Sequence, residues 1–179
     1  NVTLESGKEL VCGSIIFAGG SKCVKNIKGS DSSNVIDTDE ALDLKEAPES
    51  LVIIGADYIG VEMAQIFSSF GSKVTVVERK DSAIEVVDSE VSSILIKSLE
   101  KSGIKFIFGK EITEISGEKV LAGSEEVASA KVILVTTREA DLTALKDVNL
   151  EISNGNVVAN EKMESSLKNV YVPGDVNGK

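Results

Sequence analysis

The stretch LVIIGADYIGVE, residues 51–62, joins an apolar run to a glycine turn and has a second glycine five positions after the first. Backbone N–H groups at such a turn, together with the dipole of a helix that begins there, attract an anion. In the dinucleotide fingerprint, one glycine permits the tight turn, a second lets the backbone approach pyrophosphate, and a third permits close helix–strand packing. Gly55 and Gly60 fill the first and third places, and Asp57 stands in the middle one.

A second apolar run ends at Glu78, about 20 residues after Gly55, where an acidic side chain would hydrogen-bond the ribose hydroxyls of a dinucleotide. Arg79 and Lys80 follow and could accept a 2′-phosphate, but the carboxylate that precedes them would repel one. We therefore predict a preference for NAD over NADP. The alternative interpretation of Glu78 is a solvated charge at the end of a strand.

Asp57 leaves two interpretations of the turn open. Its side chain would occupy the space through which the backbone approaches pyrophosphate, and its carboxylate would add repulsion. The chain is then either an NAD(H)-binding region or a Rossmann-type structural or binding module in which dinucleotide binding is weak or lost.

The elements that must position these residues alternate between strands and helices. Continuous apolar runs predict strands buried in a parallel sheet at 51–54, 73–78 and 104–108. Apolar residues at helical spacing predict a helix after each of the first two strands. Gly71 is placed to end the first helix, Asp88 to cap the second and Gly103 to end it. This order is typical of an α/β fold with a Rossmann-like parallel sheet and flanking helices.

The remaining segments have shorter patterns. Turn signals predict an antiparallel meander over 111–130 that leads into a further apolar strand, KVILV, and a hairpin at 154–156. The first 20 residues resemble short strands with a turn at Gly7. Residues 22–50 are polar and are predicted to form a linker that contains one short acidic helix near 37–44.

The composition limits the classes of function. The chain has 179 residues, a net charge of −10, no histidine and two cysteines. The acidic charge argues against nucleic acid as a partner, and the lack of histidine removes the commonest general base and metal ligand, so no metal site is predicted. No apolar run approaches the roughly 18 residues that cross a bilayer, so we expect no membrane association and a cytoplasmic protein. Cys12 and Cys23 are interpreted as reduced thiols.

Three ordered motifs give the chain a specific resemblance. SIIFAGGS at 14–21, the stretch 50–78 and NVYVPGDV at 169–176 resemble the flavin-dependent pyridine nucleotide–disulfide oxidoreductases, most nearly the dihydrolipoamide dehydrogenases among them. In that family an NAD domain is inserted into an FAD domain. The resemblance implies a partial FAD-domain segment and linker at 1–44, an NAD-binding domain at 45–160, and the start of the returning FAD-domain segment at 161–179, with partial FAD-domain strands at both ends.

The resemblance also implies which parts of the enzyme this chain holds. FAD would be bound only in the full-length enzyme, where Asp175 would contact the ribityl-pyrophosphate region. The redox-active cysteine pair, the His–Glu pair and the dimer interface would lie outside the chain. We therefore expect the isolated chain to be colourless, inactive, and monomeric or weakly associated. Its partners would be NAD(H) and the remainder of a flavoenzyme chain.

Further site residues are assigned from the resemblance by position. Tyr58 and Ile59 resemble residues beside the nicotinamide pocket, and Glu62 resembles the glutamate at the carboxamide end of the cofactor. The alternatives are a surface tyrosine and an acidic residue that favours a helix start. Thr137 and Arg138 stand where the family has Gly-Arg. The chain departs from the family's pattern at AGGS, at TREAD and at Asp57, which are all near expected cofactor contacts.

Overall fold

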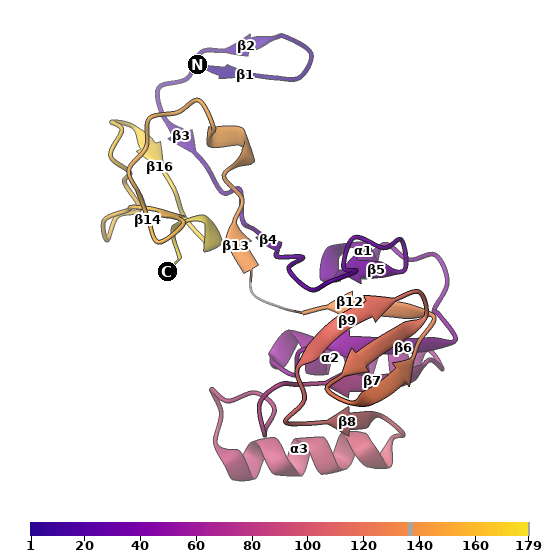
Figure 1. Ribbon diagram of the computed structural model, residues 1–179. Helices are drawn as coiled ribbons and strands as arrows, with labels where there is room; N and C mark the ends of the chain where they lie inside the picture. Colours follow the sequence, from indigo (N-terminus) through magenta and orange to yellow (C-terminus); the bar gives the residue numbers. More distant parts are fainter. Residues whose placement is uncertain (136–137, 179) are drawn as a thin grey trace. The chain divides into compact units, whose positions relative to one another are not determined.

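The structure is a computed structural model that describes residues 1–135 and 138–178 (Figure 1). The chain divides into two compact units. The sheet unit is the continuous stretch 23–137. The flanking unit combines 1–22 with 138–179.

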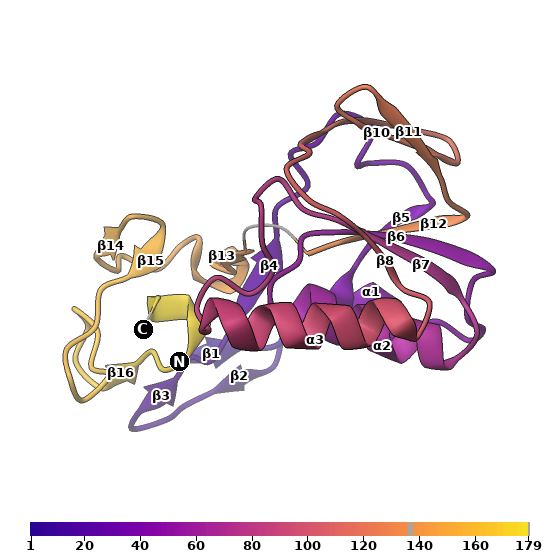
Figure 2. The same cartoon turned by 90° about the horizontal axis from the view of Figure 1, so that it is seen from below.

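The sheet unit is built on a parallel sheet of five strands in the order β5-β12-β6-β7-β8. Their bounds are Val35–Asp37 for β5, Ser50–Ile54 for β6, Lys73–Val77 for β7, Lys105–Ile107 for β8 and Lys131–Leu134 for β12. A parallel sheet needs cover on both faces. Figure 2 shows helices on one face and the β10–β11 hairpin on the other. The predicted α/β class with a Rossmann-like parallel sheet is therefore confirmed.

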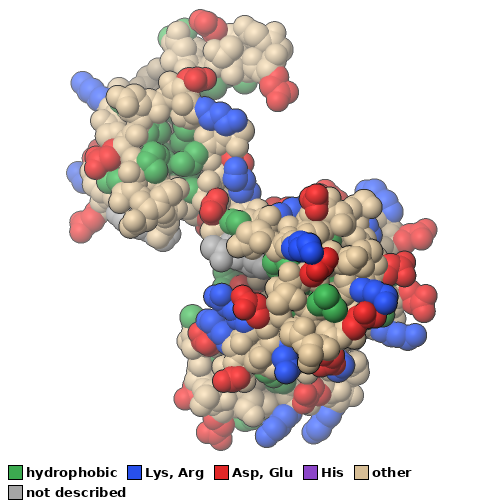
Figure 3. All heavy atoms as spheres, in the orientation of Figure 1, with side chains coloured by type: hydrophobic (Ala, Val, Ile, Leu, Met, Phe, Trp, Pro, Cys, Tyr) green, Lys and Arg blue, Asp and Glu red, His purple; other side chains and the backbone are tan. Residues whose placement is uncertain are grey.

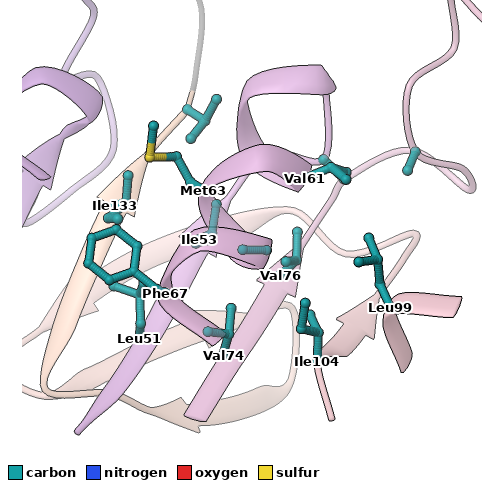
Figure 4. Packing of buried hydrophobic residues seen from close by; sticks show 14 of the residues in the cluster. Leu51, Ile53, Val61, Met63, Phe67, Val74, Val76, Leu99, Ile104 and Ile133 are labelled. Atoms are coloured by element: carbon teal, nitrogen blue, oxygen red, sulfur yellow. The ribbon is translucent and has the colours of Figure 1, made fainter. Parts of the chain in front are cut away.

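The helical face holds the larger apolar core (Figure 4). Ile53 of β6 is flanked in register by Val76 of β7 and Ile133 of β12, and all three side chains are fully buried. Met63 and Phe67 of α2, which spans Tyr58–Ser69, pack against this layer. Because successive strand residues point to opposite faces, Val52 and Ile54 contribute instead to the second core, under the meander.

The helix boundaries follow the residues that the sequence indicated. Asp88 caps α3, Ser89–Lys101, by accepting a hydrogen bond from the backbone N–H of Glu90 at 2.8 Å. Gly71 and Gly103 follow the two long helices with φ of +93° and +95°, values that glycine adopts without strain. The short helix α1, Thr38–Leu42, has a capping box between Asp37 and Glu40.

The other face of the sheet is covered by the predicted antiparallel meander. It consists of β9, Ile112–Ser116, β10, Lys119–Ala122, and β11, Glu125–Ala128. Ser129 joins the meander to β12. Its hydroxyl accepts a hydrogen bond from Val52 N–H at 2.8 Å and donates one to the carbonyl of Lys131. Ser129 is buried, so its hydroxyl satisfies a β6 donor that water does not reach.

We expect Ser129→Ala to lower the free energy of unfolding by about 1–3 kcal/mol, because it leaves the buried N–H of Val52 without an acceptor. Urea unfolding followed by helical circular dichroism measures the change. Ser124→Ala, in the exposed turn between β10 and β11, is the matched control. Equal stability of the two variants would contradict this role for Ser129.

The segment predicted as a linker contributes a strand of the sheet. Residues 35–37 form β5, which pairs in parallel with β12, and Val35 and Ile36 are buried. The prediction of a linker over 22–50 was wrong at this point. A run of only three residues between polar stretches is too brief a pattern for a strand to be recognised, and the strand is stabilised by β12, which lies far along the chain.

The flanking unit consists of short strand pairs. They are β1, Val2–Thr3, with β2, Glu9–Leu10; β3, Ile15–Ile16, with β16, Val170–Tyr171; β4, Ser21–Cys23, with β13, Arg138–Ala140; and β14, Ile152–Ser153, with β15, Asn156–Val157. Two 3₁₀ turns, η1 at Thr143–Leu145 and η2 at Asp175–Asn177, complete it. The hairpins predicted around Gly7 and at 154–156 are present.

The core of the flanking unit explains where the two units divide. Ala140, Val157, Val172 and Val176 form one buried cluster, so 138–160 packs with the C-terminal residues. The observed division after residues 22 and 137 thus differs from the expected boundaries after 44 and 160. Apolar side chains also lie on the surface of this unit (Figure 3), where Val11 and Ile16 are 85% and 72% exposed.

Candidate functional site

The turn between β6 and α2 requires both of its glycines. Gly55 has φ of +113°, and a Cβ there would lie 2.2 Å from the carbonyl oxygen of Val135. A Cβ on Gly60 would lie 2.1 Å from the carbonyl oxygen of Gly55. Contacts this short exclude a side chain at either place. The structure thus gives each glycine a physical reason: Gly55 turns with a positive φ, and Gly60 lets the start of α2 pack closely against the end of β6.

Asp57 is the N-cap residue of α2. Its backbone is extended, with φ of −73°, so the position needs no glycine for conformational reasons. The carboxylate Oδ1 accepts a hydrogen bond from Gly60 N–H at 2.9 Å. Helix N-terminal donors of this kind are the ones an anion would use. The side chain at the middle position of the fingerprint therefore already engages one of the turn's donors.

Glu78 follows β7 directly and lies against the same turn. Its Oε2 accepts a hydrogen bond from Ala56 N–H at 2.8 Å, and its Oε1 accepts one from Lys80 N–H at 3.0 Å. Gly55, Asp57, Gly60 and Glu78 are thus brought together at the carboxyl ends of β6 and β7. Ligands of open α/β sheets bind at that edge.

Three other predicted residues lie on the first turn of α2 or just after it. Tyr58 is 64% exposed, Glu62 is exposed, and Ile59 is half-buried against the core. The two polar side chains are therefore accessible to a ligand, and Ile59 is anchored. Their assignments to the nicotinamide and carboxamide ends of a cofactor stay predictions.

A second group of predicted residues lies in the flanking unit. Arg138 donates hydrogen bonds from Nε to the Ser21 hydroxyl at 2.9 Å and from its terminal nitrogen to the Ser21 carbonyl at 2.7 Å. The Ser21 hydroxyl in turn donates to Asp175 Oδ2 at 2.7 Å. Arg138 and Asp175 are therefore joined through one serine. Thr137, predicted beside Arg138, lies outside the described residues.

Ser21 is the residue of this group that sequence reasoning missed. It ends the motif SIIFAGGS, which carries part of the family resemblance, and no role was assigned to it from the sequence. A hydroxyl directly after a glycine pair, at the start of β4, was the available signal. Its geometry orients the carboxylate of Asp175 and holds β4 beside β13.

Asp141, near this network, has a lowered pKa. The hydroxyl of Thr143 donates to it, Thr143 N–H donates at 3.0 Å, and the charges of Lys22 and Lys146 add to the effect. A carboxyl whose pKa is lowered by folding stabilises the fold above its unfolded pKa, and this contribution is lost as the pH falls through the folded pKa. The stabilisation by Asp141 is therefore complete at neutral pH and is lost only in acid.

We expect Thr143→Val to raise the pKa of Asp141 toward its ordinary value, because the variant keeps the backbone donor and removes the hydroxyl. An NMR titration of the Asp141 carboxyl carbon measures the shift. Thr143→Ser retains the hydroxyl and is the matched control. An unchanged pKa in the valine variant would refute the assignment to the side-chain hydrogen bond.

The fold and the site define a Rossmann-type α/β protein, because a parallel sheet carries a glycine turn after β6 and the acidic residue Glu78 after β7. The chain matches the pyridine nucleotide-disulphide oxidoreductase family over residues 1–179, and it belongs to that family.

Within the described residues no helix is long and apolar enough to span a membrane.

Individual relatives agree with this placement. The chain is 32% identical, over its whole length, to dihydrolipoyl dehydrogenase of Acholeplasma laidlawii, of which it covers 56%. It is also 32% identical over 83% of its length to soluble pyridine nucleotide transhydrogenase of Mycobacterium tuberculosis, of which it covers 33%. The chain thus spans about half or less of these relatives.

A solved structure agrees in fold. The copper(II) complex of the HOCl-induced flavoprotein disulfide reductase RclA from Escherichia coli superimposes with a TM-score of 0.85 at 26% identity. The superposition covers 93% of this chain and 40% of that one.

Proposed function

We propose that the chain is the NAD(H)-binding region of a dihydrolipoamide dehydrogenase-like flavoprotein disulfide oxidoreductase. The observation that carries the proposal is the turn after β6, where Gly55 and Gly60 each approach backbone oxygens too closely for any side chain. Glu78 supports it, because its carboxylate lies beside that turn at the expected ribose position. The family membership of the chain supports it further.

Two features of the residues around the glycine turn favour NAD binding, and one disfavours it. The glycine turn offers a close backbone approach, and Glu78 offers a carboxylate for ribose hydroxyls. Asp57 opposes a pyrophosphate, because its carboxylate engages Gly60 N–H. When NAD is bound, it supplies hydride transfer. This chain would bind and orient it, and in the full-length enzyme electrons would be exchanged among a dithiol, FAD and NAD.

The Ser21–Arg138–Asp175 network supports a proposal for FAD in that full-length enzyme. The hydroxyl of Ser21 holds the carboxylate of Asp175 at 2.7 Å, so Asp175 would present a fixed acceptor to the cofactor's ribityl hydroxyls. Arg138 fixes Ser21 by two hydrogen bonds. These residues would orient the cofactor and take no part in electron transfer.

The direct test is a titration of the purified chain with NADH, followed by nicotinamide fluorescence and calorimetry. Glu78→Gln should weaken binding, because an amide is a poorer acceptor for ribose hydroxyls than a carboxylate. Glu118→Gln, in the exposed turn between β9 and β10, changes the net charge equally and serves as the control. Saturable binding that Glu78→Gln weakens supports the function, whereas no binding at millimolar NADH refutes it.

We expect NADH to bind more tightly than NADPH. Glu78 is held beside the turn by two backbone donors, so its charge stays near the adenosine ribose. Two like charges about 4 Å apart cost about 1 kcal/mol in water and about 4 kcal/mol at an effective dielectric constant near 20. Calorimetric dissociation constants at moderate salt measure the preference. Equal or tighter binding of NADPH would contradict the prediction.

The second candidate function is a Rossmann-type binding or structural module with weak or lost dinucleotide binding. Its specific support is the hydrogen bond from Gly60 N–H to Asp57, which fills a donor that pyrophosphate would need. Asp57→Gly discriminates between the candidates. Tight NADH binding by the wild type favours the first, and binding that appears only in the variant favours the second.

A further inference from the structure

The loop that follows Glu78, residues 79–87, is fastened to the glycine turn. Ile84 N–H donates to the carbonyl of Ala56 at 2.9 Å, while Ala56 N–H donates to Glu78 at 2.8 Å. Ile84 has φ of +47°, which is a genuine outlier for a β-branched residue. Such strain persists only where the surroundings fix the backbone, and it concentrates at functional sites. The loop therefore has a defined position relative to the turn.

Within this loop, an ion pair neutralises one of the two cations that follow Glu78. The ammonium of Lys80 contacts the carboxylate of Glu85. The backbone N–H of Lys80 is bound to Glu78 at 3.0 Å, so Lys80 begins beside the carboxylate assigned to the ribose. Glu85 follows Ile84 directly in the chain. An ammonium that is already paired gives little net attraction to a phosphate.

We propose that Glu85 is a specificity-determining residue that withholds Lys80 from the 2′-phosphate of NADP(H). The inference rests on the proposed function and adds a second element to the selection for NAD. Glu78 repels the 2′-phosphate directly. Glu85 removes the cation that would otherwise compensate this repulsion. The loop thus adds to the discrimination against NADP(H) through an ion pair outside the ribose contact itself.

The test compares NADH and NADPH binding by calorimetry in Glu85→Gln. The released ammonium should lower the dissociation constant of NADPH about three- to tenfold at low salt. The dissociation constant of NADH should change by no more than about twofold. The gain should shrink as salt rises, because both groups are about half exposed. Adding Lys80→Met to Glu85→Gln should abolish it. The series is repeated with Asp57→Gly, in which dinucleotides are expected to bind more tightly.

Glu126→Gln is the matched control, because Glu126 forms an ion pair of similar exposure with Lys119 in the meander. It changes the net charge equally and should leave the NADPH to NADH ratio unaltered. An equal gain in this control, a gain that persists without Lys80, or NADH binding with an unchanged ratio in Glu85→Gln would each overturn the inference. Failure of every variant to bind NADH would instead contradict the proposed function.

Discussion

Gly55→Ala is expected to destabilise the sheet unit by about 2–6 kcal/mol, made up of about 1–3 for the backbone strain and about 1–3 for the forced contact. The strain arises because alanine would have to adopt φ of +113°. The contact arises because its Cβ would lie 2.2 Å from the carbonyl oxygen of Val135. Since α2 and α3 both belong to the sheet unit, urea unfolding followed by helical circular dichroism measures this change.

Gly71→Ala separates the two contributions. Gly71 also has a positive φ, +93°, but a Cβ there would meet no atom within 4 Å. This variant should therefore show the backbone strain without the steric contact. If Gly55→Ala were no more destabilising than Gly71→Ala, the close packing of β6 against the residue after β12 would not be the reason for the glycine.

Asp57→Gly is expected to tighten NADH binding by about five- to a thousandfold, which corresponds to the roughly 1–4 kcal/mol that two like charges about 4 Å apart cost between water and an effective dielectric constant near 20. The variant also frees Gly60 N–H, which Asp57 engages at 2.9 Å. Glycine replaces a capping residue at a loss of only a few tenths of a kcal/mol, so the melting temperature should stay within a few degrees. Fluorescence titration and thermal unfolding measure the two effects.

Asp57→Asn identifies the cause of the gain. Asparagine caps a helix about as well as aspartate and has the same size, but it carries no charge. If charge is the main obstacle, the asparagine variant recovers most of the affinity of the glycine variant. If the occupied donor and the bulk are the obstacle, it recovers little. Wild-type binding as tight as that of Asp57→Gly would show that the carboxylate does not hinder the cofactor.

The sequence predicted the elements whose signals are local. Helix α3 begins after Asp88 and ends before Gly103, as expected. Continuous apolar runs indicated β6 and β7, because both faces of those strands are buried. Gly55, Gly60 and Glu78 were placed at one edge of the sheet by their spacing from these strands, and they lie there together.

Features that depend on distant partners could not be predicted in this way. β5 is a strand because β12 lies beside it, almost a hundred positions later. The sequence shows only that Asp57 stands in place of the middle glycine of the fingerprint. Its capping hydrogen bond with Gly60 depends on the direction of the Asp57 side chain, which the sequence does not reveal. Ser21 acquires a role only when Arg138 and Asp175 are brought to it by the returning chain.

The interrupted sequence of the flanking unit sets an order for folding during protein synthesis. β3 pairs with β16, and β4 with β13, so these two strands leave the ribosome long before their partners exist. The sheet unit is continuous and can fold as soon as residue 137 has emerged. Its folding shortens the effective loop between β4 and β13, and the entropic cost of closing a loop rises with its length. We therefore expect β3 and β4 to be the strands of this chain that stay unpaired longest during synthesis and need protection by chaperones until β13 and β16 have emerged.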